Sequence, residues 1–448
     1  MSSLTLTSKA DLITYFEHGI KSSRSIGLEH EQFVFNQTLK RLPYKGKKPT
    51  IQSLLEAFIP LGWTPIYENA LLIALKKEGS LISLEPGGQL EFSSSPHLTV
   101  FDLQKEHLQF LDDLQKILQK HSSFALGLGF DPLSTRKEVP WMPKDRYIIM
   151  REKMSKSGTL GLDMMLRTAT FQVNLDYSSE KDMCDKLRVG LALHPLIVGL
   201  FASSPLKERQ PTGFQSYRSY VWHHTDPKRT GQLDFAFEKT MGFERYVDYL
   251  LDIPLYFIYR QGTYIPLIGE TFRDFLEKGL SILPKERPTE EDWSLHISTI
   301  FPDVRLKNYL EIRGADASPN PFIGEALAAF WTGLLYDDQS FQAIKDFVNS
   351  LSPQERSFLW TIAPREGLNT HFRGKRLWDF AEECLNLAQA GLKRRHIMHQ
   401  NQLDESLFLK PLFEYIDQKK SFSDILLEAW VSKTPSEQDL YLKSLSFF

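Results

Sequence analysis

The chain has 448 residues, of which 42% are hydrophobic and 24% are charged, and its formal net charge is -3. These values are typical of a globular protein with a large core, and a charge so close to neutral predicts neither nucleic-acid binding nor attachment to an anionic membrane. Two cysteines in so long a chain indicate a reducing compartment, and Met1 to Ile20 lacks the pattern of a secretory or transit peptide, so we expect a cytoplasmic protein.

The first predicted elements are a short helix and an acidic strand. Ser8 to Lys21 carries helix-capping residues, whereas Ile26 to Phe35 is rich in β-branched and aromatic residues and predicts a strand. Glu29 and Glu31 lie two residues apart on that strand and therefore share one face. Two acids on one face repel unless a cation or water separates them, so the pair is either a candidate metal site or solvated.

A second acidic stretch runs from Ser83 to Glu91 around a Pro-Gly-Gly break. The proline and glycines exclude a helix and predict a turn that feeds a strand. On such a strand Gln89 and Glu91 point to the same side, and Glu85 precedes the turn. Carboxylates beside a glycine bend suit an oxygen-rich metal site, with a solvated edge strand as the alternative.

The middle of the chain predicts helices and one further polar strand. Thr170 to Asp176 alternates strictly, so Gln172 and Asn174 share a face opposite the apolar residues. Beside the acidic strands, we interpret that polar face as the lining of a cleft. The other predicted elements are a helix at Thr50–Phe58, strands at Glu68–Leu75, Leu81–Leu84 and Phe124–Phe130, and helices at His97–His121 and Ser178–Phe201.

The later chain contains a polar loop, a hairpin and a last acidic strand. Gly213 to Gly231 predicts a loop with Arg218 and Trp222, and its adjacent histidines point in opposite directions on an extended chain, so we expect no metal there. Tyr309 to Asp316 predicts a strand with Glu311 and Arg313 on one face. The remaining predictions are a helix and strand at Phe243–Arg260, a hairpin and helix at Gly262–Leu283, and a mainly helical part at about 320–448 within a single catalytic body, 1–448.

Together these residues predict a site for a hard cation and a phosphorylated substrate. Carboxylate and amide oxygens favour Mg²⁺ or Mn²⁺ over zinc or copper, and the cation of a metal–nucleotide offsets the repulsion among the acids. Arginines bind phosphate or carboxylate groups through two parallel hydrogen bonds. No Walker loop or GxGxxG fingerprint is present. The combination of acids, amides and arginines indicates ATP-dependent activation of a carboxylate through an acyl phosphate.

Four motifs resemble the plant and proteobacterial type of glutamate–cysteine ligase. They are Gly27-Leu28-Glu29-His30-Glu31, Ser83-Leu84-Glu85-Pro86-Gly87-Gly88-Gln89-Leu90-Glu91, the stretch from Gly158 to Thr168, and the stretch from Tyr309 to Asp316. The resemblance extends from about Asp11 to past Arg394. It implies an α+β fold similar to the catalytic domain of glutamine synthetase, with a curved, mainly antiparallel sheet that forms a funnel-shaped active site surrounded by helices.

The same resemblance implies the reaction and the residue roles. The substrates are L-glutamate, L-cysteine and ATP, with Mg²⁺ (or Mn²⁺), and the product is γ-glutamylcysteine, the first intermediate of glutathione synthesis. The implied metal ligands are Glu29, Glu31, Glu85, Glu91, Gln172 and Glu311. The implied catalytic residues are Arg313, Glu31 and Glu91, the phosphate-side contacts Asn174, Glu311 and Arg313, and the glutamate-binding residues Arg167, Arg218 and Trp222.

Three alternatives stay open from the residues alone. The site could serve a related carboxylate–amine ligase with another acceptor, a kinase-like enzyme that stops at phosphoryl transfer, or a non-catalytic nucleotide- or metal-binding relative. We expect no nucleic-acid or membrane partner, and a monomer or weak homodimer. The plant members carry redox-active cysteine pairs, whereas Cys184 and Cys384 fall on separate predicted helices, so we expect two buried thiols and no disulfide switch.

Overall fold

The computed structural model describes residues 4–399 and 401–446. Its centre is a nine-stranded sheet in the order β14-β15-β7-β1-β5-β4-β3-β2, with β6 paired to the far half of β1. All the pairs in this sheet are antiparallel. Its strands are β1 (Ile26–Asn36), β2 (Thr64–Glu68), β3 (Leu71–Lys77), β4 (Ser80–Leu84), β5 (Leu90–Ser93), β6 (Ser123–Leu126), β7 (Thr170–Leu175), β14 (Val304–Leu306) and β15 (Leu310–Asp316).

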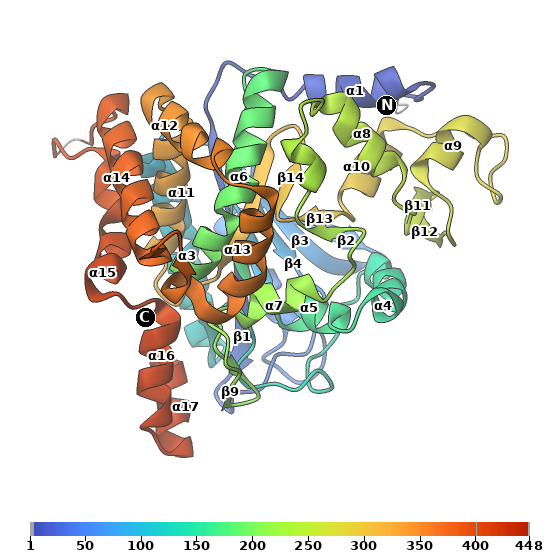
Figure 1. Ribbon diagram of the computed structural model, residues 1–448. Helices are drawn as coiled ribbons and strands as arrows, with labels where there is room; N and C mark the ends of the chain where they lie inside the picture. Colours follow the sequence, from blue (N-terminus) through green and yellow to red (C-terminus); the bar gives the residue numbers. More distant parts are fainter. Residues whose placement is uncertain (1–3, 400, 447–448) are drawn as a thin grey trace.

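Helices and short hairpins surround the sheet (Figure 1). The α-helices are α1 (Lys9–Glu17), α2 (Ile51–Phe58), α3 (Val100–Lys120), α4 (Asp145–Ser157), α5 (Gly161–Arg167), α6 (Glu180–Leu200), α7 (Tyr217–His223), α8 (Phe243–Leu251), α9 (Phe272–Lys278), α10 (Glu290–Ile297), α11 (Phe322–Leu335), α12 (Asp338–Asn349), α13 (Pro353–Glu366), α14 (Leu377–Arg395), α15 (Lys410–Gln418), α16 (Phe422–Val431) and α17 (Pro435–Ser444). The 3-10 turns are η1 (Ile59–Leu61), η2 (Asp234–Phe237), η3 (Gly367–Asn369) and η4 (Glu405–Leu409).

Eight short strands form four two-stranded pairs outside the main sheet. They are β8 (Leu206–Lys207) with β9 (Gln210–Pro211), β10 (Thr230–Gly231) with β13 (Phe301–Pro302), β11 (Phe257–Arg260) with β12 (Thr263–Pro266), and β16 (His371–Phe372) with β17 (Lys375–Arg376).

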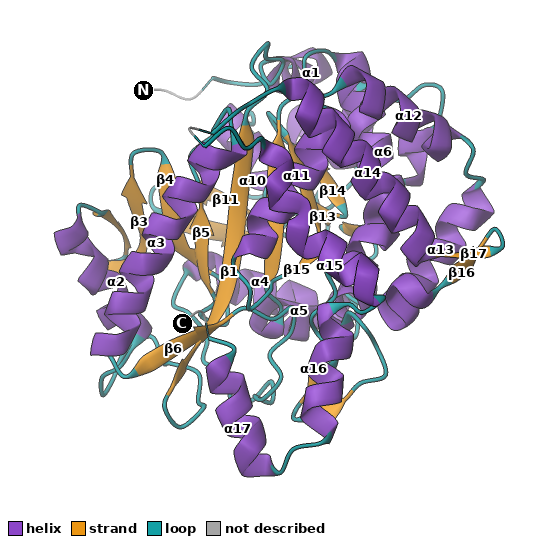
Figure 2. Ribbon diagram, turned by 90° about the vertical axis from the view of Figure 1, so that its left-hand side faces the viewer, coloured by secondary structure: helices purple, strands orange, loops and turns teal. Residues whose placement is uncertain are grey.

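One face of the sheet packs against a layer of helices. Helix α11 contacts β1 and β7, α3 contacts β1 and β6, and α6 contacts β15 (Figure 2). The side chains of Leu28, Phe171 and Val173 point into this layer and are fully buried. Because side chains alternate along a strand, the intervening residues face the opposite side. The predicted apolar face of the strand near residue 170 is therefore confirmed.

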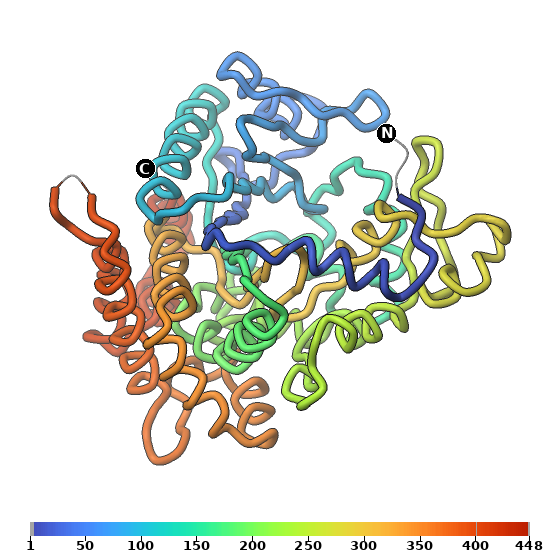
Figure 3. The backbone as a smooth tube through the Cα atoms, turned by 90° about the horizontal axis from the view of Figure 1, so that it is seen from above, coloured from blue at the N-terminus to red at the C-terminus, as the bar shows by residue number. Residues whose placement is uncertain are grey.

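A second helical layer is formed by the C-terminal part of the chain. Helices α12, α14 and α15 pack on α11 and on one another, and α13 packs on α6 (orange to red in Figure 1). Seen from above, α1 lies beside the segment that holds α8 and α10 (Figure 3). Within the described ranges no helix combines the length and apolar character needed to cross a membrane.

The α+β class and the antiparallel sheet are confirmed, and the sheet is open. The funnel shape stays a prediction. Two local predictions were wrong. Residues 213–231 were expected to form a loop but contain α7, and the strand predicted at Phe124–Phe130 ends at Leu126. Helix α7 is only seven residues long, and a short helix among polar residues has no clear hydrophobic period in the sequence.

Candidate active site

A cavity of about 380 Å³ opens on the face of the sheet away from α3 and α11. Its floor comes from β1, β5 and β7, and its walls come from α4, α5, α7 and β13. The charged and polar side chains that line it are those of Glu29, Glu31, Ser83, Glu85, Gln89, Glu91, Lys144, Arg146, Tyr147, Thr168, Thr170, Gln172, Arg218, Trp222, Ser298, Arg305 and Arg313. The two acidic motifs, far apart in sequence, meet in this cavity.

Strand register brings the acidic residues together. Glu31 on β1 is the direct partner of Glu91 on β5, and Glu91 in turn is the partner of Ser83 on β4. Direct partners of an antiparallel pair point to the same face of a sheet. Glu91 accepts hydrogen bonds of 3.1 Å from the hydroxyls of both Ser83 and Ser93. The carboxylates of Glu31 and Glu91 are therefore neighbours on the cavity side.

The polar face of β7 continues this arrangement on the other side of β1. Gln172 is the direct partner of Glu29, and Asn174 is the direct partner of Glu311 on β15. The amide of Asn174 donates a 2.8 Å hydrogen bond to Glu29. The prediction that this face of β7 lines a cleft is correct for Gln172, whereas Asn174 lies just beyond the cavity wall and contacts it through Glu29.

Burial and mutual repulsion destabilise the charged form of these carboxylates and raise their pKa values. Burial raises the pKa of Glu29 to about 7, and Glu311 and Glu91 add to the rise. Burial likewise raises the pKa of Glu91 to about 7, with Glu85 as the neighbour that adds most. The pKa of Glu31 lies well above its ordinary value, again through burial and then through Glu85 and Glu91. Protons or a bound cation relieve such repulsion, so the cluster is suited to cation binding.

Basic side chains gather around Glu311, on the strand next to β7. Glu311 is fully buried, and Arg305 donates to both of its oxygens at 2.7 and 2.9 Å. Lys307 lies 2.6 Å from the second oxygen, and Arg313 bonds to the first. Burial alone would raise the pKa of Glu311, but Arg305, Lys307 and Arg313 together hold it well below its ordinary range.

The environment of Glu311 bears on its predicted role as a metal ligand. Both carboxylate oxygens already accept from cationic side chains, so a metal ion at this position would have to displace Lys307 or Arg313. Arg313 also donates to the side-chain oxygen of Gln172. In this structure Glu311 therefore holds the two arginines in place, and its role as a metal ligand stays a prediction.

The arrangement of the acids fits a magnesium ion that binds together with the phosphate groups of a nucleotide. Among the residues that the structure describes, no three carboxylate, imidazole or thiolate groups converge on one point as a complete metal cage. Mg²⁺ commonly takes only one or two protein carboxylates, and the other ligands are waters and substrate phosphates. The pairs Glu29/Glu31 and Glu85/Glu91 match that requirement, with phosphate oxygens to complete the coordination.

The Pro-Gly-Gly turn between β4 and β5 is held in place by specific contacts. The carbonyl oxygen of Gly87 accepts a 2.6 Å hydrogen bond from Arg41, which is buried. A Cβ atom at Gly87 would lie 2.3 Å from the carbonyl oxygen of Leu166, so a side chain there would clash with α5. The amide of Gln89 donates to the carbonyl of Thr168 at 2.8 Å. The turn that carries Glu85 is thus fastened to the end of α5.

Two of the three residues predicted to bind glutamate lie in the cavity wall. Arg218 and Trp222 are on α7, and both line the cavity. Arg218 donates to the carbonyl oxygen of Arg313 at 2.8 Å, and the guanidinium of Arg313 lies 5.5 Å from the centre of a Trp222 ring. The structure therefore places an arginine pair and an indole at one end of the cavity.

Arg167 does not lie with them. It is 1% exposed, lies outside the cavity lining, and pairs with Asp163 at 3.2 Å and Glu208 at 3.0 Å. Its guanidinium covers the ring of Phe130 at 4.5 Å. Residues at the end of a short helix such as α5 point in directions that sequence spacing does not reveal. The observed position does not support the predicted contact with glutamate.

Four ionisable residues of the cavity lining were not predicted from the sequence. Lys144, Arg146 and Tyr147 come from the start of α4, and Arg305 comes from β14. The ammonium of Lys144 and the hydroxyl of Tyr147 both donate to the carbonyl of Leu84, next to Glu85. The run Lys144-Asp145-Arg146 after a proline-containing loop was the available signal, but only tertiary packing turns it toward the acids.

Comparisons with known proteins agree on one family. The model of glutamate–cysteine ligase family 2 matches residues 25–445. Chloroplastic glutamate–cysteine ligase of Arabidopsis thaliana is 48% identical over 390 residues, which cover 86% of this chain and 74% of the relative. The corresponding protein of Medicago truncatula is 43% identical over 434 residues, which cover 96% and 84%.

Two solved structures share the fold at low sequence identity. The crystal structure of glutamate–cysteine ligase from Francisella tularensis in complex with AMP has a TM-score of 0.58 and 15% identity, and the match covers 95% of this chain and 88% of that one. A bifunctional glutathione synthetase from Pasteurella multocida has a TM-score of 0.52 and 13% identity over 98% of this chain and 52% of that one.

Proposed function

The chain belongs to glutamate–cysteine ligase family 2, and on that premise we propose how its cavity carries out the reaction. The enzyme joins the γ-carboxylate of L-glutamate to the amine of L-cysteine and consumes ATP, which gives γ-glutamylcysteine, ADP and phosphate. The observation that carries the proposal is that the acids Glu29, Glu31 and Glu91 line one cavity together with Arg218 and Arg313.

The reaction takes place in two steps because a carboxylate is a poor acyl donor. In the first step an oxygen of the γ-carboxylate attacks the γ-phosphorus of ATP, the bond to the ADP oxygen breaks, and γ-glutamyl phosphate forms. In the second step the free amine of cysteine attacks the acyl carbon, a C–N bond forms, and phosphate leaves while the nitrogen loses a proton. No protein nucleophile is needed for either bond change.

The acids would hold the cation that accompanies the nucleotide. We assign Glu29, Glu31, Glu85 and Glu91 to this role, with Gln172 beside them on the same face. When bound, Mg²⁺ neutralises phosphate oxygens and orients them for in-line transfer. The acids themselves keep the cation near the floor of the sheet, and the hydrogen bonds of Ser83 and Ser93 orient the carboxylate of Glu91.

The basic end of the cavity would stabilise the transferred phosphoryl group. The guanidinium of Arg313 is fixed by Glu311 and Gln172, so it enters the reaction already oriented. A preorganised cation stabilises developing charge without the cost of reorientation during the reaction. We place Asn174 and Glu311 behind it as supports, and Arg218 with Trp222 as the contacts for the rest of the glutamate molecule.

The decisive experiment measures ADP release with ATP, Mg²⁺ and L-glutamate, with and without L-cysteine. Release that depends on cysteine, together with a γ-linked dipeptide in the mixture, is the expected result. If only another amine stimulated ADP release, cysteine would not be the acceptor. ADP release without any amine would indicate a kinase-like activity. ATP binding without release under all conditions would favour the non-catalytic alternative and overturn the proposal.

Several properties beyond the reaction are also proposals. We propose Mg²⁺ as the cation, with Mn²⁺ able to replace it, a single catalytic body, and a monomer or weak homodimer. Equilibrium sedimentation over a range of concentrations tests the last of these. The amino-acid composition favours the cytoplasm, whereas the plant relatives are named as chloroplastic, and cell fractionation decides between the two.

A further inference from the structure

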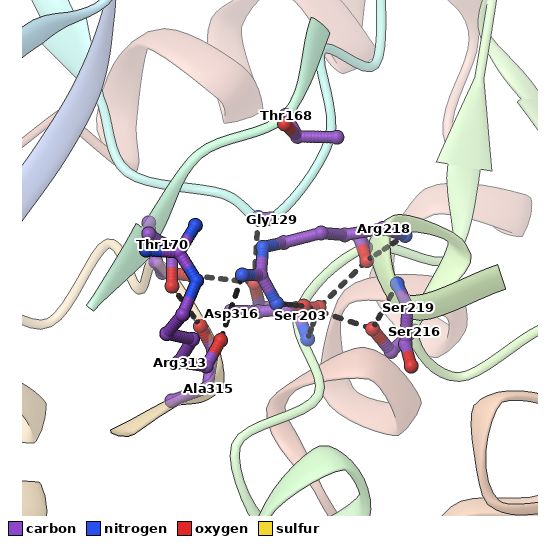
Figure 4. A network of polar contacts seen from close by, with 12 residues as sticks. Gly129, Thr168, Thr170, Ser203, Ser216, Arg218, Ser219, Arg313, Ala315 and Asp316 are labelled. Atoms are coloured by element: carbon purple, nitrogen blue, oxygen red, sulfur yellow. Dashed lines mark hydrogen bonds and ion pairs between the residues drawn. The ribbon is translucent and has the colours of Figure 1, made fainter. Parts of the chain in front are cut away.

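A buried aspartate at the end of β15 connects three segments behind the cavity wall. Asp316 is 1% exposed. One of its carboxylate oxygens accepts from the backbone N–H of Ser203 at 3.0 Å and from the hydroxyl of Ser204 at 2.6 Å. The other accepts from the hydroxyl of Ser216 at 2.8 Å. Figure 4 shows Asp316 between Ser203, Ser216 and Arg218.

The same contacts control the start of α7, which carries Arg218. The hydroxyl of Ser216 accepts from the backbone N–H of Ser219 and so caps the helix, while it donates to Asp316. The hydroxyl of Ser204 accepts from the backbone N–H of Arg218 at 3.1 Å. Both serines thus connect Asp316 to the first turn of α7, and the N-cap satisfies a backbone N–H group that would otherwise lack a partner within the helix.

Arg218 itself lies between two acids. One guanidinium nitrogen is 3.8 Å from a carboxylate oxygen of Asp316, and the other terminal nitrogen donates to the carbonyl of Arg313. On the cavity side, the charge of Arg218 offsets part of the rise in the pKa of Glu31 that burial, Glu85 and Glu91 cause. The Nε atom is buried and has no hydrogen-bond partner among residues 4–399 and 401–446. The guanidinium therefore has an unused donor and lines the cavity.

The chain provides a closely fitted space for the carboxylate of Asp316. A Cβ atom at Gly129 would lie 2.3 Å from its Cγ atom, so any side chain at Gly129 would displace the aspartate. The register of β15 against β7 shifts between Ile312 and Ala315, and this irregularity sets the position of the strand end. Such a bulge changes the direction in which the following side chains point.

We propose that Asp316 is a positioning residue that holds Arg218 in the cavity wall, away from Glu31, so that its guanidinium receives the α-carboxylate of glutamate. This inference rests on the proposed function. Because the γ-carboxylate must reach ATP, the α-carboxylate has to bind at a separate cation. Without the charge of Asp316, Arg218 would pair with Glu31 and neutralise an acid that the cation needs.

The test compares Asp316→Asn with the wild-type enzyme. The amide keeps the size of the side chain and removes its charge, so we expect the KM for glutamate to rise at least 10-fold while the KM for ATP changes less than 3-fold. Calorimetric titration of the protein with glutamate alone should show the same loss of affinity. An unchanged KM for glutamate in folded Asp316→Asn would overturn the proposal.

A double-variant cycle separates this role from a merely structural one. Arg218→Lys should raise the KM for glutamate, and the double variant should be no weaker than the poorer single variant, because both changes remove the same contact. Additive losses would contradict the proposal. If Arg218→Lys alone leaves glutamate binding unchanged while ligation continues, the glutamate role of Arg218 fails, and the inference about Asp316 falls with it although the proposed reaction stands.

Two further variants keep the test decisive. Asp292→Asn is the matched control, since Asp292 is also buried, caps a helix and pairs with an arginine, Arg260, but lies outside the cavity lining. It should lower thermal stability without a change in the KM for glutamate. Should Asp316→Asn fail to fold, Ser216→Ala removes one bond to the carboxylate together with the N-cap of α7, and a rise of about 2- to 5-fold in that KM is expected; no rise would overturn the proposal.

Discussion

Glu31 on β1 and Glu91 on β5 are direct partners across an antiparallel pair, so the carboxylates of two motifs sixty residues apart lie side by side. Replacement of either residue by glutamine should reduce ligation by at least ~10³-fold, because a neutral amide does not hold the cation that orients the phosphates. Thermal stability should stay unchanged or increase, since the variant removes a buried, repelled charge.

The matched control for these variants is Glu382→Gln. Glu382 lies half-exposed on α14, outside the cavity lining, and forms a 4.0 Å ion pair with Lys419. It should leave both activity and melting temperature unchanged. Normal ligation in both Glu31→Gln and Glu91→Gln would show that these acids do not bind the cation.

The raised pKa values of the acids predict how stability depends on pH without metal. Glu29 and Glu91 have a pKa of about 7 in the folded protein and an ordinary value of 4.5. The folded state therefore binds more protons than the unfolded state between these values, and stability is lost as the pH rises through 7. Each acid contributes on the order of 1 to 3 kcal/mol to this loss.

Buried histidines make the free energy of unfolding rise with pH, in the opposite direction to the acids. Burial lowers the pKa of His223 and of His296 to about 3, from an ordinary value of 6.5. Unfolding then takes up protons below pH 6.5, so stability falls as the pH drops. Between pH 5 and 6.5 the opposing slopes of two acids and two histidines cancel, so urea unfolding should give similar free energies at pH 5 and 6.5 and a lower value at pH 8. Glu91→Gln should reduce the loss between pH 6.5 and 8, and an unchanged slope would contradict the raised pKa.

Arg313 should be sensitive even to replacement by lysine. Arg313→Lys keeps the charge but loses the planar guanidinium that bonds to Glu311 and Gln172 at once. We expect kcat to fall about 10²-fold to 10³-fold with less than a 3-fold change in the KM for glutamate, because the lost interaction acts on the transferred phosphoryl group. The control is Arg245→Lys, because Arg245 on α8 is partly buried, pairs with Glu238 and lies outside the cavity lining, so this variant should retain full activity.

Arg167 should matter for stability and not for glutamate binding. Arg167→Met removes the buried cation that pairs with Asp163 and Glu208, while Asp163 keeps its ion pair with the partly exposed Arg136. We therefore expect a loss of about 3 kcal/mol, the lower end of the range for a broken buried ion pair. Chemical unfolding should show this loss, while the folded fraction binds glutamate with the wild-type KM. A variant of normal stability with a KM raised more than 10-fold would restore the contact that the sequence motif implied.

Redox conditions should have no effect through the two cysteines. Cys184 and Cys384 are free and buried, and burial raises their pKa to about 11 and 12. Thiolates are the reactive form, so both groups should react with a disulfide reagent only slowly in the folded protein. Activity assayed after oxidised or reduced glutathione should be equal, and the double alanine variant should behave identically. A reversible change with the wild-type protein alone would contradict this prediction.

The sequence by itself determined which side chains share a face. Strict alternation in β1 and β7 placed Glu29 with Glu31 and Gln172 with Asn174, because successive side chains of a strand point to opposite sides. The Pro-Gly-Gly break predicted the turn before β5 for the same kind of local reason. Each of these predictions depends only on backbone geometry within a few residues.

Only the tertiary structure decided which residues meet and which do not. Strand register made Glu31 the partner of Glu91, packing of α4 brought Lys144 to the acids, and the burial of Arg167 turned it away from the cavity. The surroundings of Glu311 likewise depend on Arg305 and Lys307, which a hairpin brings beside it. The physical reason is that contacts, burial and the resulting pKa values depend on residues distant in the chain, whereas the direction of a strand side chain depends on its immediate neighbours.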